Sequence, residues 1–135
     1  MIKDLFSSDG RLSESLENYE ERSQQREMAE KVFDAFKHSH IALIEAGTGI
    51  GKSIAYLAPA LYFAHKEKEK TVISTYTISL QEQLIHKDIP FLTNALGIEI
   101  HAVLVKGMNN YLCLRKLEAA PEDEEISKLK LFAFS

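Results

Sequence analysis

A nine-residue stretch in the first half of the chain has the residue types and spacing of a phosphate-binding loop. It reads E-A-G-T-G-I-G-K-S and runs from Glu45 to Ser53. It follows the pattern G-x-x-x-x-G-K-[ST] from Gly51 onward and has Ala46 at the position of the first glycine. Because backbone N–H groups and the N-terminus of the following helix hold the phosphates, that first side chain is dispensable. The stretch therefore predicts a nucleotide-binding site.

Each residue type in this loop has a chemical task. Glycines let the backbone approach phosphate oxygens without an intervening Cβ. We expect the Lys52 ammonium to reach the β- and γ-phosphates and so to act in catalysis, and the Ser53 hydroxyl to ligate Mg²⁺. The residues predicted to bind the nucleotide here are Ala46, Gly47, Thr48, Gly49, Ile50, Gly51, Lys52 and Ser53.

The segments on either side of the loop support this interpretation. Residues 40–45 (H-I-A-L-I-E) are apolar on both faces, which is typical of a buried parallel strand, and residues 54–66 have an apolar pattern of helix length. Strand, loop and helix is the order that a phosphate-binding loop requires. The alternative is a glycine-rich turn that carries an incidental lysine.

The rest of the chain alternates between helical and strand patterns. Its first residues, 1–18, are polar with a few apolar positions and are expected to form an arm or short helix packed on the domain. The sequence further predicts a helix capped by Ser23, a strand over 71–75, a helix from Ser79 that is interrupted near Pro90 and stopped by Gly97, and a strand over 98–105. This order predicts an α/β fold with right-handed crossovers, in which a parallel sheet carries helices on both faces.

Composition excludes several classes of protein. The 135 residues are 45% hydrophobic and 27% charged, as expected of one globular domain, and contain a single cysteine, so no internal disulfide can form. The first residues lack the apolar core of a signal peptide, and no apolar run approaches the length of a membrane span. We therefore expect a cytoplasmic protein without a membrane segment. The net charge of −4 means that a nucleic-acid surface must be local.

Polar residues follow the predicted strands at the sheet edge where ligands bind in parallel α/β proteins. Thr75, Thr77 and Gln81 come after the second strand and could hydrogen-bond a phosphodiester backbone. The alternative is that Ser79 caps the next helix and that the other polar residues are ordinary surface.

Four blocks of sequence, taken in order, resemble the DinG/XPD-like branch of superfamily 2 ATP-dependent DNA helicases. They are Y-E-E-R-S-Q-Q-R-E-M (19–28), E-A-G-T-G-I-G-K-S (45–53), S-T-Y-T-I-S-L-Q-E-Q-L (74–84) and K-G-M-N-N-Y-L-C (106–113). The resemblance runs from about Tyr19 to Leu117 and implies the N-terminal part of a RecA-like P-loop NTPase domain. We divide the chain accordingly into an arm (1–18), a partial ATP-binding domain (19–117) and an acidic turn with a C-terminal helix (118–135).

The resemblance also implies roles for particular residues. Read alone, Arg22 and Gln25 are polar residues at a helix start and are expected to be solvated; by resemblance they recognise adenine. Single-stranded DNA is expected to contact Thr75, Thr77, Gln81 and Lys106. Cys113 matches the first of four cysteines that hold an iron–sulfur cluster in many relatives, but no further cysteine follows it. We expect no cluster here, and a buried or helix-face thiol at Cys113.

Other parts of a helicase do not occur in these 135 residues. The D-E-A-H motif that binds Mg²⁺ and orients water in relatives is missing, as is a second motor domain. We expect a piece of a DNA-repair-type helicase that binds ATP, Mg²⁺ and single-stranded DNA but is inactive alone. It would be a truncated product or one half of a split protein whose partner chain carries the other motifs.

Two other functions remain open at the level of sequence. One is a small nucleotide kinase, although the chain downstream of the loop supplies only Arg115 for the arginine-rich lid that kinases need. The other is a catalytically silent nucleotide-binding or regulatory protein.

Overall fold

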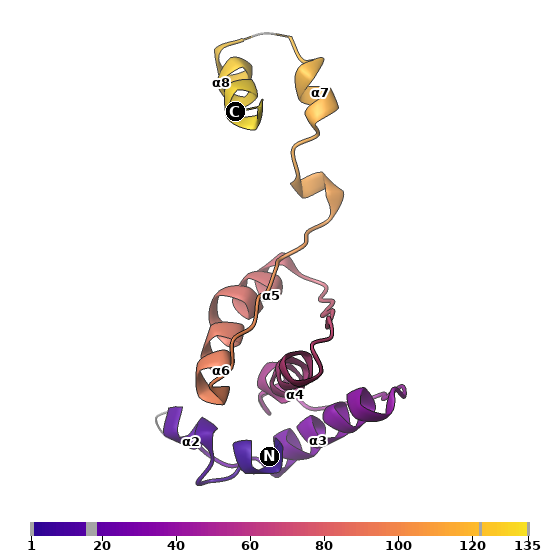
Figure 1. The fold of residues 1–135 in the computed structure, drawn as a ribbon, viewed down its shortest axis with the longest axis vertical. Helices are drawn as coiled ribbons and strands as arrows, with labels where there is room; N and C mark the ends of the chain where they lie inside the picture. Colours follow the sequence, from indigo (N-terminus) through magenta and orange to yellow (C-terminus); the bar gives the residue numbers. More distant parts are fainter. Residues whose placement is uncertain (1, 16–18, 122, 135) are drawn as a thin grey trace. The chain divides into compact units, whose positions relative to one another are not determined.

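The computed structural model describes residues 2–15, 19–121 and 123–134. The chain divides into two compact units, Met1–Leu104 and Val105–Ser135. The first contains α1 (Ile2–Leu5), α2 (Arg11–Ser15), α3 (Ser23–His38), α4 (Lys52–Glu67), α5 (Ile78–Gln83), the π-helical η1 (Leu84–Asp88) and α6 (Ile89–Leu96); the second contains the 3₁₀ turn η2 (Met108–Asn110), α7 (Leu114–Glu118) and α8 (Glu124–Phe134) (Figure 1). Among these helices, none has the length and apolar character needed to cross a membrane.

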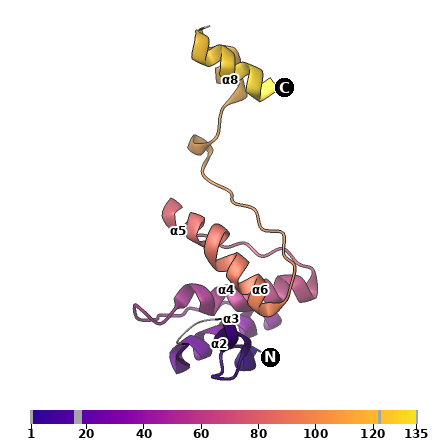
Figure 2. The same cartoon turned by 90° about the vertical axis from the view of Figure 1, so that its left-hand side faces the viewer.

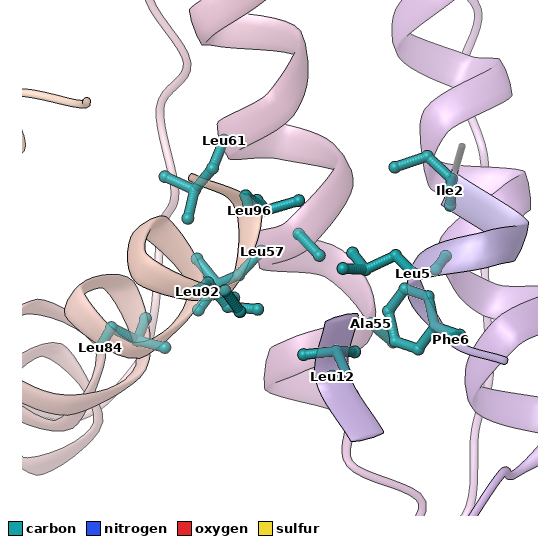
Figure 3. Packing of buried hydrophobic residues seen from close by; sticks show 13 residues of the cluster. Ile2, Leu5, Phe6, Leu12, Ala55, Leu57, Leu61, Leu84, Leu92 and Leu96 are labelled. Atoms are coloured by element: carbon teal, nitrogen blue, oxygen red, sulfur yellow. The ribbon is translucent and has the colours of Figure 1, made fainter. Parts of the chain in front are cut away.

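The core of the first unit is built from aliphatic side chains of its helices. Figure 3 shows Leu57 of α4 and Leu92 of α6 in the same cluster as Leu12 of α2, and all three are fully buried. Leu5, the last residue of α1, and Phe6, which follows it, also belong to this cluster. Residues 2–15 therefore pack on the helical core. Residues 1 and 16–18 of the predicted arm lie outside the described residues.

The longest helices of this unit, α3 and α4, pack side by side (Figure 2). Two aromatic pairs join them: the ring centroids of Phe33 and Tyr62 lie 5.8 Å apart, and those of Phe36 and Phe63 lie 5.1 Å apart. Such pairs stabilise a helix interface beyond the area that they bury. The prediction that Ser23 caps α3 is wrong, because the cap is Arg22, one residue earlier, and no side chain caps the helix there.

The helical segment after residue 77 follows its sequence signals closely. Thr77, rather than Ser79, is the N-cap of α5, and its Oγ1 accepts a hydrogen bond from the Leu80 N–H at 3.3 Å. Pro90 has no N–H to donate, and just before it the chain widens into η1, where the Ile89 N–H reaches the Leu84 carbonyl. Gly97 ends α6 in the left-handed region at φ 64°, so the predicted stop is confirmed.

The predicted parallel sheet is not formed. Residues 41–45, 71–75 and 99–104 run between helices without regular structure, and in the described part of the chain no backbone hydrogen bond joins any two of them. The strand predictions for 40–45, 71–75 and 98–105 are therefore corrected. A strand exists only where a neighbouring backbone lies about 4.8 Å away, and these segments have helices rather than strands as neighbours.

Replacing Leu12 by alanine tests whether the N-terminal segment belongs to the core. Because Leu12 is fully buried, we expect Leu12→Ala to lower the free energy of unfolding by about 2–5 kcal/mol through lost burial and the cavity left behind. Leu131→Ala, at a side chain that is 76% exposed, should change it by less than about 0.5 kcal/mol. Urea denaturation measures both, and equal effects would show that residues 1–15 do not pack as described.

Candidate nucleotide-binding site

The predicted phosphate-binding loop connects an extended segment to the first turn of α4. Its backbone needs glycine at two positions, since Gly49 and Gly51 have φ values of 81° and 79°. Side chains rarely tolerate this left-handed conformation. Gly47 does not have a positive φ, and a Cβ built there would meet nothing within 4 Å. The loop therefore turns at Gly49 and Gly51 and stays open beside Gly47.

The Lys52 ammonium folds back over the loop. Its Nζ donates hydrogen bonds to the carbonyl oxygens of Gly47 at 2.7 Å and Ala46 at 3.1 Å. Both acceptors are neutral, and phosphate oxygens would make stronger charge-assisted bonds with the same ammonium. The cation is thus held at the loop by contacts that an anion can replace.

The start of α4 offers further donors to an anion. The first helical hydrogen bond runs from the Ala55 N–H to the Gly51 carbonyl at 3.1 Å. Among the residues that the structure describes, none accepts a hydrogen bond from the N–H groups of residues 52–54. Unpaired amides at the N-terminus of a long helix bind phosphate, and the helix dipole adds to their attraction. The loop, Lys52 and these amides therefore fit a phosphate group.

Two side chains of α3 fix the loop from the other side. Arg22 Nη1 donates to the Gly49 carbonyl at 2.6 Å, and Gln25 Nε2 donates to the Gly51 carbonyl at 3.0 Å. Gln25 is only 7% exposed, so the expectation of a solvated glutamine is wrong. Each bond ends on one of the two glycines with positive φ. The position of the α3 N-terminus therefore affects the conformation of the loop.

The predicted magnesium ligand Ser53 has a partner that the sequence did not single out. Its side chain hydrogen-bonds to the Tyr56 phenol. Burial raises the pKa of Tyr56 and the Asp88 carboxylate raises it further, while the bond with Ser53 opposes these effects. The phenol is therefore protonated at physiological pH. The sequence could have suggested this pair, because Ser53 and Tyr56 are three residues apart on one helix and so lie on the same face.

The predicted DNA-binding residues of the first unit lie at the end of the second extended segment and just after it. Thr75 Oγ1 donates to the Thr77 carbonyl at 3.3 Å, and Thr77 caps α5. Gln81 lies on α5 and is half-buried.

The two remaining predicted site residues belong to the second unit. The Lys106 N–H donates to the Tyr111 hydroxyl at 2.8 Å. Cys113 occupies the N-cap position of α7 and is exposed, so of the two expected placements, buried or on a helix face, the buried one is wrong. The short helix that follows it buries only Leu117, which leaves no core for the cysteine to enter.

A group of metal-ligand side chains lies at the opposite end of α3. The Asp34 carboxylate lies 2.9 Å from His38 Nδ1 and 3.6 Å from His40 Nε2. By helix geometry this end is roughly 20 Å from Gln25, so the group is not part of the loop site. All three side chains are exposed. Histidines in the last turn of a helix beside a carboxylate are accounted for by mutual pairing and the helix dipole.

Alanine substitutions at Gly51 and Gly47 compare a loop glycine with positive φ with one that has open space around it. A Cβ at Gly51 would lie 2.1 Å from Gln25 Nε2 and would require a left-handed alanine. We expect Gly51→Ala to destabilise the nucleotide-free chain by about 1–3 kcal/mol. Gly47→Ala, in open space, should change stability by less than about 1 kcal/mol. Thermal unfolding without nucleotide is the measurement, and a Gly47→Ala effect as large as that of Gly51→Ala would contradict this geometry.

Comparison with known proteins shows the family of this chain. The sequence profile of the DEAD/DEAH box helicases matches residues 23–126. The chain is 44% identical over 114 residues to the 3'-5' exonuclease DinG of Bacillus subtilis, 43% over 117 residues to the ATP-dependent DNA helicase YoaA of Escherichia coli and 43% over 119 residues to the ATP-dependent helicase DinG of Mycobacterium tuberculosis. No solved structure matches it.

These alignments cover 84%, 87% and 82% of this chain but only 12%, 18% and 18% of the three relatives. The matched stretch corresponds to the N-terminal part of the relatives. The family match implies a P-loop NTPase fold and a domain that uses ATP with Mg²⁺. The chain therefore belongs to the DEAD/DEAH box helicase family, as a stretch that corresponds to the N-terminal part of DinG- and YoaA-type proteins.

Proposed function

We propose that this chain forms the ATP-binding part of the first motor domain of a DinG/YoaA-type ATP-dependent DNA helicase. The observation that carries the proposal is the loop at the start of α4, with Lys52 Nζ over its carbonyls and Gln25 and Arg22 bonded to its glycines. The chain spans at most 18% of the relatives described above. DNA unwinding is therefore proposed for the whole protein and not for these residues alone.

In this proposal the phosphates of ATP lie between the α4 N-terminus and Lys52. The ammonium exchanges the carbonyls of Ala46 and Gly47 for phosphate oxygens, and the amides of residues 52–54 supply the remaining donors. The Ser53 hydroxyl would hold the magnesium ion. When bound, Mg²⁺ neutralises charge on the β- and γ-phosphates.

Recognition of adenine is the proposed role of Gln25. Its Nε2 already donates to the Gly51 carbonyl, which leaves the side-chain oxygen as an acceptor. Adenine presents an amino group that donates and a ring nitrogen, N7, that accepts. The Gln25 oxygen can therefore take the adenine amino group while its nitrogen keeps the loop in place, and Arg22 supports the neighbouring turn.

Single-stranded DNA is the proposed nucleic-acid partner. Thr77 uses a hydroxyl lone pair to cap α5, so its hydrogen remains available to a phosphate oxygen. Thr75, Gln81 and Lys106 add a hydroxyl, an amide and an ammonium, which are the groups that contact nucleic-acid backbones. Such contacts position a strand without reading its sequence, as a translocating enzyme requires.

The remainder of the motor is proposed to come from polypeptide outside residues 1–135. Hydrolysis needs a carboxylate opposite Ser53 and a second domain that closes on the nucleotide. A separate chain, or the rest of one continuous polypeptide, would supply both and would complete the parallel sheet. In the complete protein we place this stretch in the cytoplasm.

Exonuclease activity, which is part of the name of the Bacillus subtilis relative, is not proposed for this chain. Phosphodiester cleavage by nucleases commonly uses carboxylates that hold two metal ions. The described residues contain one group of three ligand-type side chains, at Asp34, His38 and His40, and its members pair with one another. Kinase chemistry is likewise not favoured, because the match is to helicases.

Removing the loop lysine tests nucleotide binding. We expect the chain to bind ATP weakly and more tightly with Mg²⁺, and Lys52→Ala to weaken this binding at least about tenfold, because each charge-assisted bond is worth roughly 1.5–3 kcal/mol. Lys66→Ala, on the exposed end of α4, is the matched control and should bind as the wild type does. Calorimetric titration with ATP gives both affinities. Equal affinity of the wild type and Lys52→Ala would refute the assignment of the loop.

The isolated chain is expected to show no DNA-stimulated ATP turnover, no unwinding and no bound iron. Turnover needs groups that this stretch lacks, and Cys113 is the only thiolate available to a cluster that usually takes four. Phosphate release in the presence of single-stranded DNA, strand-displacement assays and iron analysis of anaerobically purified protein check this. Turnover that Lys52→Ala abolishes, or stoichiometric iron, would contradict the proposal.

A further inference from the structure

Three side chains at the C-terminal end of α3 have the composition of a transition-metal site. Asp34 and His38 stand one turn apart on the helix, and His40 follows just beyond its last residue. Their ligand-type atoms, a carboxylate oxygen and two imidazole nitrogens, all lie within 4.8 Å of one another. Among the described residues no other group of three such side chains comes this close together. The candidate nucleotide-binding site at the other end of α3 uses none of them.

The backbone turn after α3 brings the second histidine back beside the first. Ser39 lies in the left-handed region at φ 53° and ψ 41°, which is uncommon for a residue with a Cβ. The N–H groups of Ser39 and His40 both donate to the Ala35 carbonyl, the latter at 3.2 Å. The imidazole rings of His38 and His40 are nearly parallel, with centroids 6.3 Å apart and planes inclined by 5°. The backbone of the turn therefore helps to hold the cluster together.

The spacing of the ligand atoms fits a single metal ion. The Asp34 carboxylate lies 2.9 Å from His38 Nδ1 and 3.6 Å from His40 Nε2. Bonds of about 2.0–2.2 Å to one ion place two ligand atoms roughly 3–4 Å apart. All three side chains are exposed, so small rotations of the side chains bring the ligand atoms to these separations.

Mutual pairing accounts for this cluster when no metal is bound. A proton on either imidazole nitrogen is attracted to the carboxylate between them, and such exposed pairs are weak. A divalent ion takes the place of these protons, since metal ligands must be deprotonated. It contacts the carboxylate and both imidazoles at once, which a proton on one ring cannot do. The same three side chains therefore suit a metal ion better than they suit one another.

The ligand set selects the kind of metal. Imidazole nitrogens suit Zn²⁺ and other late divalent transition metals, whereas Mg²⁺ and Ca²⁺ prefer oxygen ligands. Three protein ligands leave at least one position for water. Asp34 and His40 line a hollow of about 520 Å³ along α3, and Glu27, Glu30 and Lys31 line it as well. Three carboxylates and one ammonium in this hollow favour a cation.

We propose that Asp34, His38 and His40 bind a divalent transition metal of the Zn²⁺ type. The ion joins two ligands on the last turns of α3 to one beyond its C-cap, so it fastens the chain that leaves the helix to the helix itself. This site does not depend on the proposed function, because none of its ligands contacts the phosphate-binding loop.

Zinc titration of the full chain tests this site. The parent protein carries no polyhistidine tag and contains Cys113→Ser, which removes the exposed thiol as a competing ligand. Calorimetric titration with zinc chloride should show one saturable site, and millimolar Mg²⁺ should not displace the zinc. His40→Ala should weaken binding at least about tenfold, because losing even a group that only supports a ligand lowers metal affinity about 10–100-fold.

His86→Ala is the matched control. His86 Nε2 lies 3.0 Å from the Glu82 carboxylate in an i, i+4 pair like that of Asp34 and His38. That pair belongs to no group of three ligand-type side chains in the described part of the chain. His86→Ala should therefore bind zinc as the parent does.

Thermal unfolding gives a second readout. Zinc at about 100 times its Kd should raise the Tm of the parent by at least about 5 °C and leave that of His40→Ala unchanged, because only the native state holds the three ligands together. His38→Ala repeats the comparison if His40→Ala does not fold. Absence of saturable zinc binding, displacement by Mg²⁺, equal affinity of the parent and the histidine variants, or loss of binding in His86→Ala would each overturn the proposal.

Discussion

The packing of α3 along α4 is the contact on which the candidate site depends. The phosphate-binding loop leads directly into α4, while the two side chains that hold it, Arg22 and Gln25, stand at the start of α3. Aromatic pairs such as Phe33 with Tyr62 fix the two helices against each other. The register of this interface decides whether the α3 side chains reach the carbonyls of Gly49 and Gly51, and so couples a helix face to the shape of the loop.

The loop illustrates how a site for an anion can be stable without one. The carbonyls of the left-handed Gly49 and Gly51 accept hydrogen bonds from Arg22 and Gln25, and Lys52 donates to the carbonyl of Gly47. The side chains of Arg22, Gln25 and Lys52 each donate a hydrogen bond to a neutral carbonyl of the loop. A phosphate bound as proposed would compete only with neutral carbonyls for the lysine.

The packing of the helices does not pair the three extended segments, 41–45, 71–75 and 99–104, into a sheet. The helices bury Leu12, Leu57 and Leu92 in a core of their own, which explains how this stretch packs without a sheet. The extended segments contribute Ile73 and Ile100 to that core but gain no ladder hydrogen bonds from it. Hydrophobic burial is non-directional and is satisfied by helix contacts alone, whereas strand pairing requires a second backbone at a fixed distance.

What the sequence determined by itself is local. The loop pattern, the stop at Gly97 and the interruption near Pro90 depend on backbone freedom and missing donors within a few residues, and the structure confirms the last two. The resemblance to helicases was likewise carried by short ordered blocks, and the family match agrees with it. Tertiary structure decided the rest. Gln25 is buried because α4 brings Gly51 to it, Cys113 is exposed because no core forms around α7, and the predicted strands stay unpaired because pairing depends on neighbours that local pattern cannot supply.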